Sequence, residues 1–201
     1  TCRPPSHHRF AQVLASAATS QLGSRYRTSI SKVCSEPGEL VQLITNSVEA
    51  QNHLARLRAL AAGADELLVL SPFISPDLDK LLARMALPHL ERFRLITTLQ
   101  PYSPSQLWTL RALEAVHQYC REVRPDVQLT MQLVRNLHGK VYVFRSEGRT
   151  YAALVSSANF TENGLRLNAE WGVALTEESI LLDIDRSIDA LEAITLRVED
   201  L

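Results

Sequence analysis

Short apolar runs alternate with longer segments of helical spacing through the middle of the chain, and later such runs follow one another directly. This change of pattern is the feature that most restricts the fold. The runs typical of strands are 66–70, 93–98, 127–133, 140–145, 151–156 and 170–175. Strands interleaved with helices, followed by adjacent strands, are typical of a mixed sheet covered by helices. The sequence therefore predicts an α/β domain with a mixed β-sheet flanked by helices on both faces.

The predicted helices begin and end at residues with known capping preferences. Asn46 followed by Glu49 resembles a capping box and predicts a helix that ends at Gly63, a residue suited to a helix C-terminus. The other predicted helices start at Ser75-Pro76-Asp77, run from Ser103 to about Val123, and occupy the acidic amphipathic segment 177–199. In the helix after Asp77, the apolar residues Leu78, Leu81, Leu82 and Met85 form one inward stripe.

The length of 201 residues fits one domain with a core of its own. Residues 1–38 are rich in Ser, Pro, Arg and His and lack periodicity, so we expect an N-terminal extension that is partly disordered. We expect 39–201 to form the folded, functional domain.

Charge and cysteine content exclude some classes of protein. The formal net charge is −1, so the chain is not a basic nucleic-acid binder, and any site for a polyanion must be a local patch. Cys2, Cys34 and Cys120 are odd in number and widely spaced, which favours free thiols in a reducing compartment and predicts a cytoplasmic location. No apolar run approaches the ~20 residues that a membrane-spanning helix needs.

Side chains suited to binding and attacking a phosphate lie on or beside the last predicted strands. His138 and Lys140 are two apart at the start of a strand, so their side chains share a face. Ser157 and Asn159 follow the next strand, and Glu170 begins the one after. If these strands are neighbours, the five side chains converge at one end of the sheet.

Each of these groups has a chemical role in such a site. Neutral His138 would attack phosphorus and form a phosphohistidine, which divides one difficult displacement into two easier ones. Lys140 and Asn159 would hold the non-bridging oxygens and stabilise the transition state, with a further hydrogen bond from Ser157. Glu170 would accept the second ring N–H of His138 and so fix its tautomer.

Taken singly, the same residues have ordinary structural explanations. A lone H-x-K on a strand is common, and Ser-x-Asn after a strand usually forms a turn through hydrogen bonds to its own backbone. Glu170 alone is most often a solvated strand residue. The order and the spacing of the whole set favour the functional interpretation.

That order resembles the phospholipase D superfamily, which is named for its H-x-K-x4-D motif. The matching sequence segments are Leu-His-Gly-Lys-Val-Tyr, Ser-Ala-Asn-Phe-Thr-Glu-Asn-Gly-Leu and Asn-x-Glu-Trp-Gly, all within 137–172. It is similar to the nuclease branch that contains phospholipase D-type restriction endonucleases. The resemblance implies a phospholipase D-like fold and cleavage without a metal or cofactor. It implies that the catalytic residues are His138, Lys140, Asn159 and Glu170, with Ser157 supporting the phosphate.

The chain departs from the family pattern at two positions. Arg145 stands where the motif has Asp, a residue that the nuclease branch often lacks. Ser156 stands where the family usually has Gly, and its side chain either narrows the phosphate pocket or faces away.

Only one copy of the motif is present, although the family mechanism uses two histidines. His7, His8, His53, His89 and His117 lack the x-Lys partner, and we expect them to be surface or helix histidines. The resemblance therefore implies a homodimer in which two copies of His138 face each other across a two-fold axis.

The resemblance favours DNA, or another nucleic acid, as the substrate. The candidate contacts to its phosphates are Arg135, Arg145, Arg149 and Arg166. The site residues contain no cluster with metal-ligand spacing. No segment is suited to a lipid surface, since the acidic helix 177–199 would be repelled by anionic lipid. A separate targeting or translocating module or protein would direct the activity.

Two other functions stay open on the sequence alone. One is a phospholipid phosphodiesterase or transphosphatidylase. The other is a non-catalytic nucleic-acid-binding or scaffold domain whose site has decayed, marked by Arg145 and Ser156.

Overall fold

The computed structural model describes residues 40–85, 87–99, 103 and 105–197. The chain divides into two units, Thr1–Gly38 and Glu39–Leu201, and all described residues belong to the second. The predicted extension, 1–38, lies outside the described residues.

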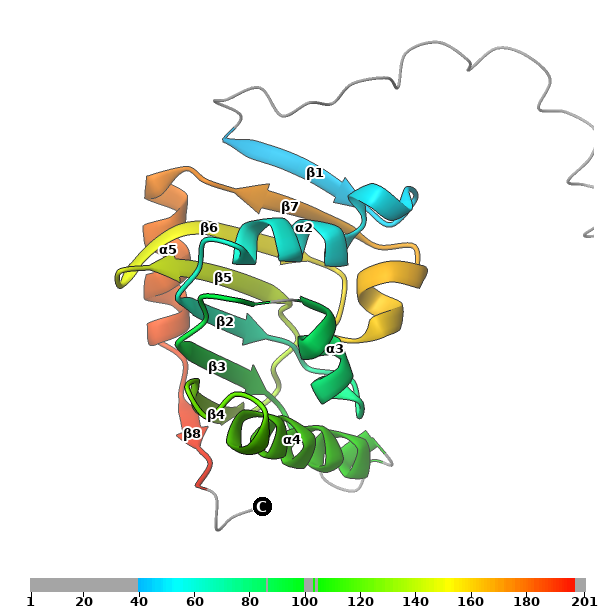
Figure 1. Cartoon of the computed structure of the whole chain (residues 1–201). Coiled ribbons are helices and arrows are strands. Elements are labelled where there is room, and N and C mark those ends of the chain that lie inside the picture. The colour runs from blue at the N-terminus through cyan, green and yellow to red at the C-terminus, as the bar shows by residue number, and fades with distance from the viewer. Residues whose placement is uncertain (1–39, 86, 100–102, 104, 198–201) are drawn as a thin grey trace, which may run out of the picture. The chain divides into compact units, whose positions relative to one another are not determined.

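One eight-stranded mixed sheet forms the centre of the domain, in the order β1-β7-β6-β5-β2-β3-β4-β8 (Figure 1). The strands are β1 Val41–Thr45, β2 Glu66–Leu70, β3 Arg92–Thr97, β4 Gln128–Val134, β5 Val141–Ser146, β6 Arg149–Ser156, β7 Trp171–Leu175 and β8 Ala193–Thr195. Strands β2, β3 and β4 pair in parallel, because helices connect them, and every other pairing is antiparallel.

Helices cover both faces of this sheet, as Figure 1 shows. On one face lie α2 His53–Ala61, α3 Leu78–Met85 and α4 Ser105–Glu122, and on the other lies α5 Glu178–Asp189. A 3-10 turn, Glu49–Gln51, precedes α2, and a π-helix, Asn163–Leu167, lies between β6 and β7. The predicted α/β fold class is confirmed.

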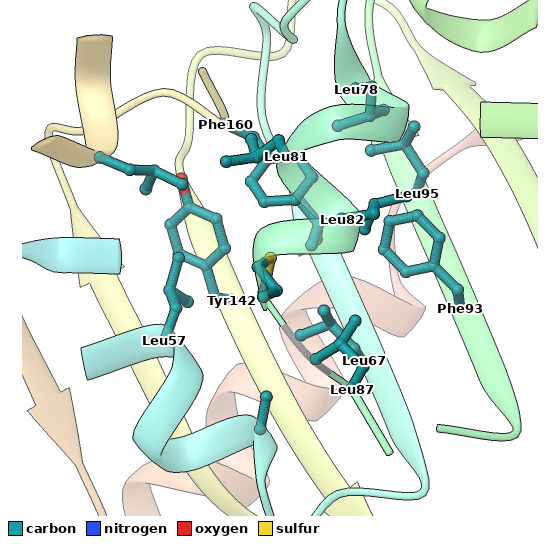
Figure 2. Close-up of a cluster of buried hydrophobic side chains, with 14 of the residues drawn as sticks. Leu57, Leu67, Leu78, Leu81, Leu82, Leu87, Phe93, Leu95, Tyr142 and Phe160 are labelled. Atoms are coloured by element: carbon teal, nitrogen blue, oxygen red, sulfur yellow. The ribbon is translucent and has the colours of Figure 1, made fainter. Parts of the chain in front are cut away.

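The main core fills the space between the sheet and helices α2, α3 and α4 (Figure 2). The predicted stripe of α3 is buried there: Leu78, Leu81, Leu82 and Met85 are all at most 3% exposed. They pack with strand residues such as Phe93 and Leu95. A smaller core under α5 contains Leu181 and Ile188. Each buried leucine or phenylalanine contributes about 1.5–3 kcal/mol, so this packing fixes the strands that carry the site.

The first predicted helix begins later than expected. Asn52, not Asn46, is the N-cap of α2, and its side chain accepts the N–H of Ala55 at 2.9 Å. Asn46 accepts the N–H of His53 from outside the helix at 3.1 Å. The capping-box pattern was wrong because the chain makes a 3-10 turn at Glu49 before the helix starts.

Two short strands at the edges of the sheet were not predicted. Strand β1 pairs with β7 alone, and only Ile44 of its five residues is buried, so its sequence shows no clear periodicity. Strand β8 pairs with β4, and α5 ends at Asp189 rather than near residue 199. The β-branched pair Ile194-Thr195 favours a strand at this position.

The antiparallel pairings bring several strand ends together. We call the motif end the end where β1, β2 and β6 finish and where β5 and β7 begin: Leu70 pairs there with Val141, and Ser156 with Gly172. The hairpin end is the opposite one, where the turn between β5 and β6 lies and Glu66 pairs with Arg145.

Candidate active site

His138 and Lys140 lie at the motif end, in the segment between β4 and β5. Asn136 turns the chain there with φ of 57°, a left-handed conformation that asparagine adopts more readily than most residues. The carbonyl of Lys140 then accepts the N–H of Ser156 at 3.0 Å. Lys140 Nζ donates to the carbonyl of His138 at 2.9 Å and lies 3.5 Å from its Nδ1. The ammonium and the exposed imidazole therefore meet beside the end of β6.

The turn after β6, which carries Ser157 and Asn159, is anchored in the core. Tyr142 Oη donates to the carbonyl of Ala158 at 2.8 Å, and burial raises the pKa of Tyr142, so the hydroxyl keeps its proton. Phe160 is fully buried, with its ring centroid 5.9 Å from that of Tyr142. These two contacts, one on each side of Asn159, fix the backbone of the turn.

Asn159 is held tightly by its neighbours. Its Oδ1 is buried without a hydrogen-bond partner in the described part of the chain, which costs about 1–3 kcal/mol. A Cβ at Gly164 would lie 2.5 Å from the carbonyl oxygen of Asn159, so only glycine lets the π-helix approach this closely. Asn159 is therefore held in place by packing against the π-helix rather than by a hydrogen bond from its Oδ1.

Glu170 lies against the same turn. Its Oε2 accepts a short hydrogen bond from Ser157 Oγ, and its Oε1 lies 3.4 Å from Asn168 Nδ2. Ser157 Oγ in turn accepts the N–H of Trp171 at 3.1 Å, and the Ser157 N–H donates to the carbonyl of Trp171 at 2.9 Å. Ser157 therefore ties the end of β6 to the start of β7.

The predicted hydrogen bond between Glu170 and the ring of His138 is absent from the described structure. The carboxylate is engaged by Ser157 and Asn168, while Nδ1 of His138 faces Lys140. The sequence thus predicted the end of the sheet where the five side chains lie, but not how they pair in the free chain.

A histidine that the sequence did not single out lies beneath the turn. His53 is 0% exposed, so it is not a surface residue. Its Nδ1 is 2.7 Å from Asn46 Oδ1, and its Nε2 is 2.8 Å from Ser156 Oγ. Since Asn46 Nδ2 donates to the carbonyls of Gly164 and Asn168, Asn46 Oδ1 must accept. Nδ1 of His53 therefore carries the proton, and Nε2 accepts from Ser156.

We call this arrangement the Asn46–His53–Ser156 chain. Burial lowers the pKa of His53, and the charge of Glu170 raises it by a smaller amount. The lowered pKa favours the neutral ring that these contacts require. Ser156 Oγ also accepts the N–H of Ala158 at 2.8 Å. The chain therefore braces both the turn after β6 and, through Asn46, the segment that leads to Glu170.

The geometry also settles how Ser156 fits where the family has glycine. Its hydroxyl donates to His53 Nε2 at 2.8 Å and accepts the N–H of Ala158, while the carbonyl of Trp171, at 3.2 Å, is an alternative acceptor for the same proton. Gly172 leaves the space for this pair, because a Cβ there would lie 2.8 Å from His53 Nε2 and 3.0 Å from Ser156 Cβ. Spacing along the sequence gave no signal for a contact over 103 positions.

The candidate arginines do not form one patch. Arg135 follows β4 at the motif end, is exposed, and forms no ion pair with the described residues. Arg149 lies at the hairpin end and pairs with Glu178 at 2.6 Å. Arg166, in the π-helix, pairs with Glu162 at 2.5 Å and Glu49 at 3.2 Å.

Arg145 has a structural position rather than a place beside the phosphate-binding residues. At the hairpin end its guanidinium binds Glu66 at 2.7 Å and Asp185 at 2.8 Å, and Nε donates to Thr150 at 3.1 Å. Its side chain is only 15% exposed. Lys140 immediately precedes strand β5, and Arg145 lies near its far end. The spacing of the motif alone did not predict this separation.

Other kinds of site receive no support at the motif end. No group of three or more His, Cys, Asp or Glu side chains in the described residues is arranged to hold a metal ion. None of the helices in the described residues is both long enough and apolar enough to cross a membrane. A hollow of about 840 Å³ lies at the hairpin end instead, lined by residues that include Asp65, Glu91 and Ser146.

Three solved structures are similar to this chain. The phosphatidylserine synthase of Haemophilus influenzae Rd KW20 has a TM-score of 0.59 and 14% identity, covering 98% of this chain and 48% of that one. NucT from Helicobacter pylori has a TM-score of 0.50 and 14% identity, with coverage of 75% and 96%. Nuc from Salmonella typhimurium, a phospholipase D family member, has a TM-score of 0.48 and 14% identity, covering 77% of this chain and 97% of that one. At such low identity the first two show a shared fold alone.

The sequence itself gives the family. A search of the curated proteins finds no match. The model of the NgoFVII restriction endonuclease N-terminal phospholipase D domain matches residues 50–199. This match covers about three quarters of the chain and includes every predicted site residue. The chain therefore belongs to the family of NgoFVII restriction endonuclease N-terminal phospholipase D domains.

Proposed function

We propose that this chain is a metal-independent phosphodiesterase that cleaves DNA, with a phosphohistidine intermediate at His138 and an active site shared across a homodimer. The observation that carries the proposal is the meeting of His138 and Lys140 with the turn of Ser157 and Asn159 at one end of the sheet. Family membership supports a phosphodiesterase of nuclease type.

In the first step Nε2 of His138 attacks phosphorus and the bond from phosphorus to the leaving oxygen breaks. Lys140 Nζ carries positive charge beside the imidazole and neutralises the oxygens of the pentavalent transition state. In the second step water attacks the phosphohistidine, and the nitrogen–phosphorus bond breaks to regenerate His138.

The leaving oxygen needs a proton, and the described part of one chain offers no second H-x-K histidine to supply it. We propose that His138 of a second copy donates that proton and then activates the water. A two-fold axis near the motif end brings two identical residues together without any further sequence. The proposed partner is therefore a second copy of this chain.

Attack through Nε2 also requires that Nδ1 of His138 carry a proton and have an acceptor. Lys140 cannot accept a hydrogen bond as an ammonium, so the carboxylate of Glu170 is the proposed acceptor. Glu170 would have to leave Ser157 and turn toward His138. Ser157 would then be free to donate to a phosphate oxygen.

Two finer parts of the proposal concern context. We propose a cytoplasmic location, a reducing compartment in which widely spaced cysteines stay as free thiols. We also propose that a separate targeting or translocating module or protein directs the activity.

The test is cleavage of DNA, offered both as supercoiled plasmid and as a single strand, by the purified chain in excess EDTA, with His138→Ala as the matched control. Cleavage by the wild type alone supports the proposal, and equal behaviour of the two proteins rejects it. Vesicles with a choline headgroup form the second arm, and release of choline in place of DNA cleavage would establish a lipid substrate instead.

The shared site has its own measurements. Sedimentation at micromolar concentration should give a dimer, and quenching a reaction on radiolabelled DNA should trap an acid-labile adduct on His138. A chain that is monomeric while fully active would contradict the shared site.

A further inference from the structure

The exposed aromatic side chains of the described residues belong to segments that begin or end at the motif end. Phe73, Trp108 and Trp171 are 40%, 53% and 61% exposed. Phe73 follows the end of β2, Trp171 begins β7, and Trp108 lies in the first turn of α4, which starts beyond the end of β3 (Figure 1). The other described aromatic residues are buried or half-buried.

Phe73 is fixed next to a predicted catalytic residue. Ser71 Oγ donates to the carbonyl of Phe73 at 2.6 Å and accepts the N–H of Phe160 at 2.9 Å. Ile74 forms a β-bridge with Phe160, and the Ser75 N–H donates to the carbonyl of Phe160 at 3.0 Å. One hydroxyl thus binds both the backbone of Phe73 and the residue that follows Asn159. The exposed ring of Phe73 is therefore carried by a backbone that is fixed beside the turn of Asn159.

Trp108 is paired with a cation on the outer surface of α4. The guanidinium of Arg111 lies 5.8 Å from the ring centroid of Trp108, one helical turn farther along. Neither side chain is buried, and Arg111 forms no ion pair with the described residues. An indole with an adjacent guanidinium is a suitable platform for a planar base.

The distribution of charge does not suit a long track of duplex phosphates. Nine arginines of the described residues are held in ion pairs with carboxylates: Arg84, Arg92, Arg94, Arg121, Arg124, Arg145, Arg149, Arg166 and Arg186. At the motif end Arg111, Arg135 and Lys140 form no ion pair within the described ranges, and neither does the half-buried Arg56 in the first turn of α2. Duplex binding depends on neutralising many phosphates, whereas base stacking provides about 1–3 kcal/mol per base without added charge.

We propose that the substrate enters the site as a single-stranded stretch of nucleic acid, with one unstacked base on Phe73 and another on the Trp108–Arg111 pair. This inference rests on the proposed nuclease function and names the form of its substrate. The exposed or half-exposed cations Arg111, Arg135 and Lys140 then contact the few phosphates near His138, and the aromatic rings supply the rest of the affinity.

The experiment compares one oligonucleotide as a single strand, as a full duplex and as a duplex with an unpaired gap, all in EDTA. We expect kcat/KM on the single strand and at the gap to exceed that on the duplex at least tenfold. Phe73→Leu, which keeps apolar area but removes the ring face, should lower kcat/KM on the single strand about 5- to 30-fold, the equivalent of roughly 1–2 kcal/mol. Phe73→Trp should restore it.

Trp108→Leu should have a similar or smaller effect, and the matched control is Leu107→Ala. Leu107 is 65% exposed on the neighbouring position of α4, but it has no aromatic face, so its variant should equal the wild type. A preference for the duplex, or an unchanged Phe73→Leu variant, would overturn the proposal. So would a Phe73→Leu variant that sediments as a monomer, because the ring would then be a protein contact.

Binding separates this inference from the proposed function. The His138→Ala variant should bind a fluorescent single strand with the same dependence on Phe73, whether or not the wild type cleaves. Cleavage of all three substrates at equal rates would leave the nuclease proposal standing and remove the stacking one. Tight, Phe73-dependent binding with no cleavage would do the reverse.

Discussion

The two ends of strand β5 differ in how their charges are satisfied. At the hairpin end, Arg145 is bound by Glu66, Asp185 and Thr150, and every one of these side chains has a partner. At the motif end, Lys140 donates only to His138, next to it in the motif, and Asn159 Oδ1 has no partner among the described residues. The charged groups at the hairpin end are therefore paired within the fold, while at the motif end the ammonium of Lys140 has no carboxylate partner among the described residues.

The difference shows why a count of arginines near the motif is a poor guide to a binding surface. Arg145 and Arg149 lie close to His138 in sequence, but an antiparallel hairpin carries them to the opposite end of the sheet. Substitutions at the two ends should therefore separate activity from stability.

The largest effect is expected at the motif end. His138→Ala should lower the rate of DNA cleavage at least about a thousandfold, since it removes the proposed nucleophile. The melting temperature should stay within a degree or two, because the ring is exposed and contacts only Lys140. Parallel rate and thermal-unfolding measurements check this. A large drop in the melting temperature of His138→Ala would mean that the motif end also stabilises the fold.

The opposite result is expected at the hairpin end. Arg145→Asp restores the residue of the motif but places a third carboxylate between Glu66 and Asp185. Breaking such a largely buried network should cost about 3–5 kcal/mol in the free energy of unfolding. Urea denaturation measures this cost. A stable, more active Arg145→Asp protein would contradict the structural assignment of Arg145.

Two glycines provide a matched pair within the motif end. A Cβ at Gly172 would clash with the buried His53 ring, so Gly172→Ala should destabilise the chain by about 1–3 kcal/mol. Gly139→Ala meets nothing within 4 Å and should leave stability nearly unchanged. Thermal unfolding measures both variants, and equal melting temperatures would contradict the predicted difference.

The smallest effect concerns pH. Because burial lowers the pKa of His53 below its ordinary 6.5, the unfolded chain takes up a proton more readily than the folded one. The contribution of His53 to stability is therefore complete above pH 6.5 and decreases as the pH falls toward the folded pKa. The slope is at most about 1.4 kcal/mol per pH unit.

His53→Gln is the control for this pH dependence, since an amide offers both a donor and an acceptor but does not titrate. Its unfolding free energy should depend less on pH between 5 and 6.5. We also expect His53→Ala to lower kcat more than KM changes, with partial recovery in His53→Gln, if the Asn46–His53–Ser156 chain positions the catalytic turn. Identical pH slopes in wild type and His53→Gln would reject the role of His53.

Periodicity predicted most of the fold because the buried strands and the stripe of α3 have strong patterns. Strands β1 and β8 were missed because an edge strand buries one side at most, and its sequence then carries little periodic signal. The helix expected over 177–199 was too long because the pattern did not mark the break after Asp189.

The candidate site was predictable where order along the chain determines position. His138 and Lys140, Ser157 and Asn159 are each two apart, so register brings them to one end of a hairpin. His53 and Phe73 were not predictable in the same way. His53 reaches the site through its contact with Ser156, and the segment of Phe73 reaches it through Ser71 and Ile74, which bind Phe160; tertiary packing alone creates those contacts.

Gly172 restricts which residues related chains can combine at three positions. The space that it leaves is used by His53 and Ser156 together, so the three positions are expected to covary. A relative with glycine in place of Ser156 has no hydroxyl to offer the ring, so only the bond to Asn46 would still favour the histidine there. A relative that keeps Ser156 must keep the histidine and the glycine as well. Ser156, which makes the motif of this chain unusual, therefore depends on His53 and Gly172, and both lie outside the turn that Ser156 supports.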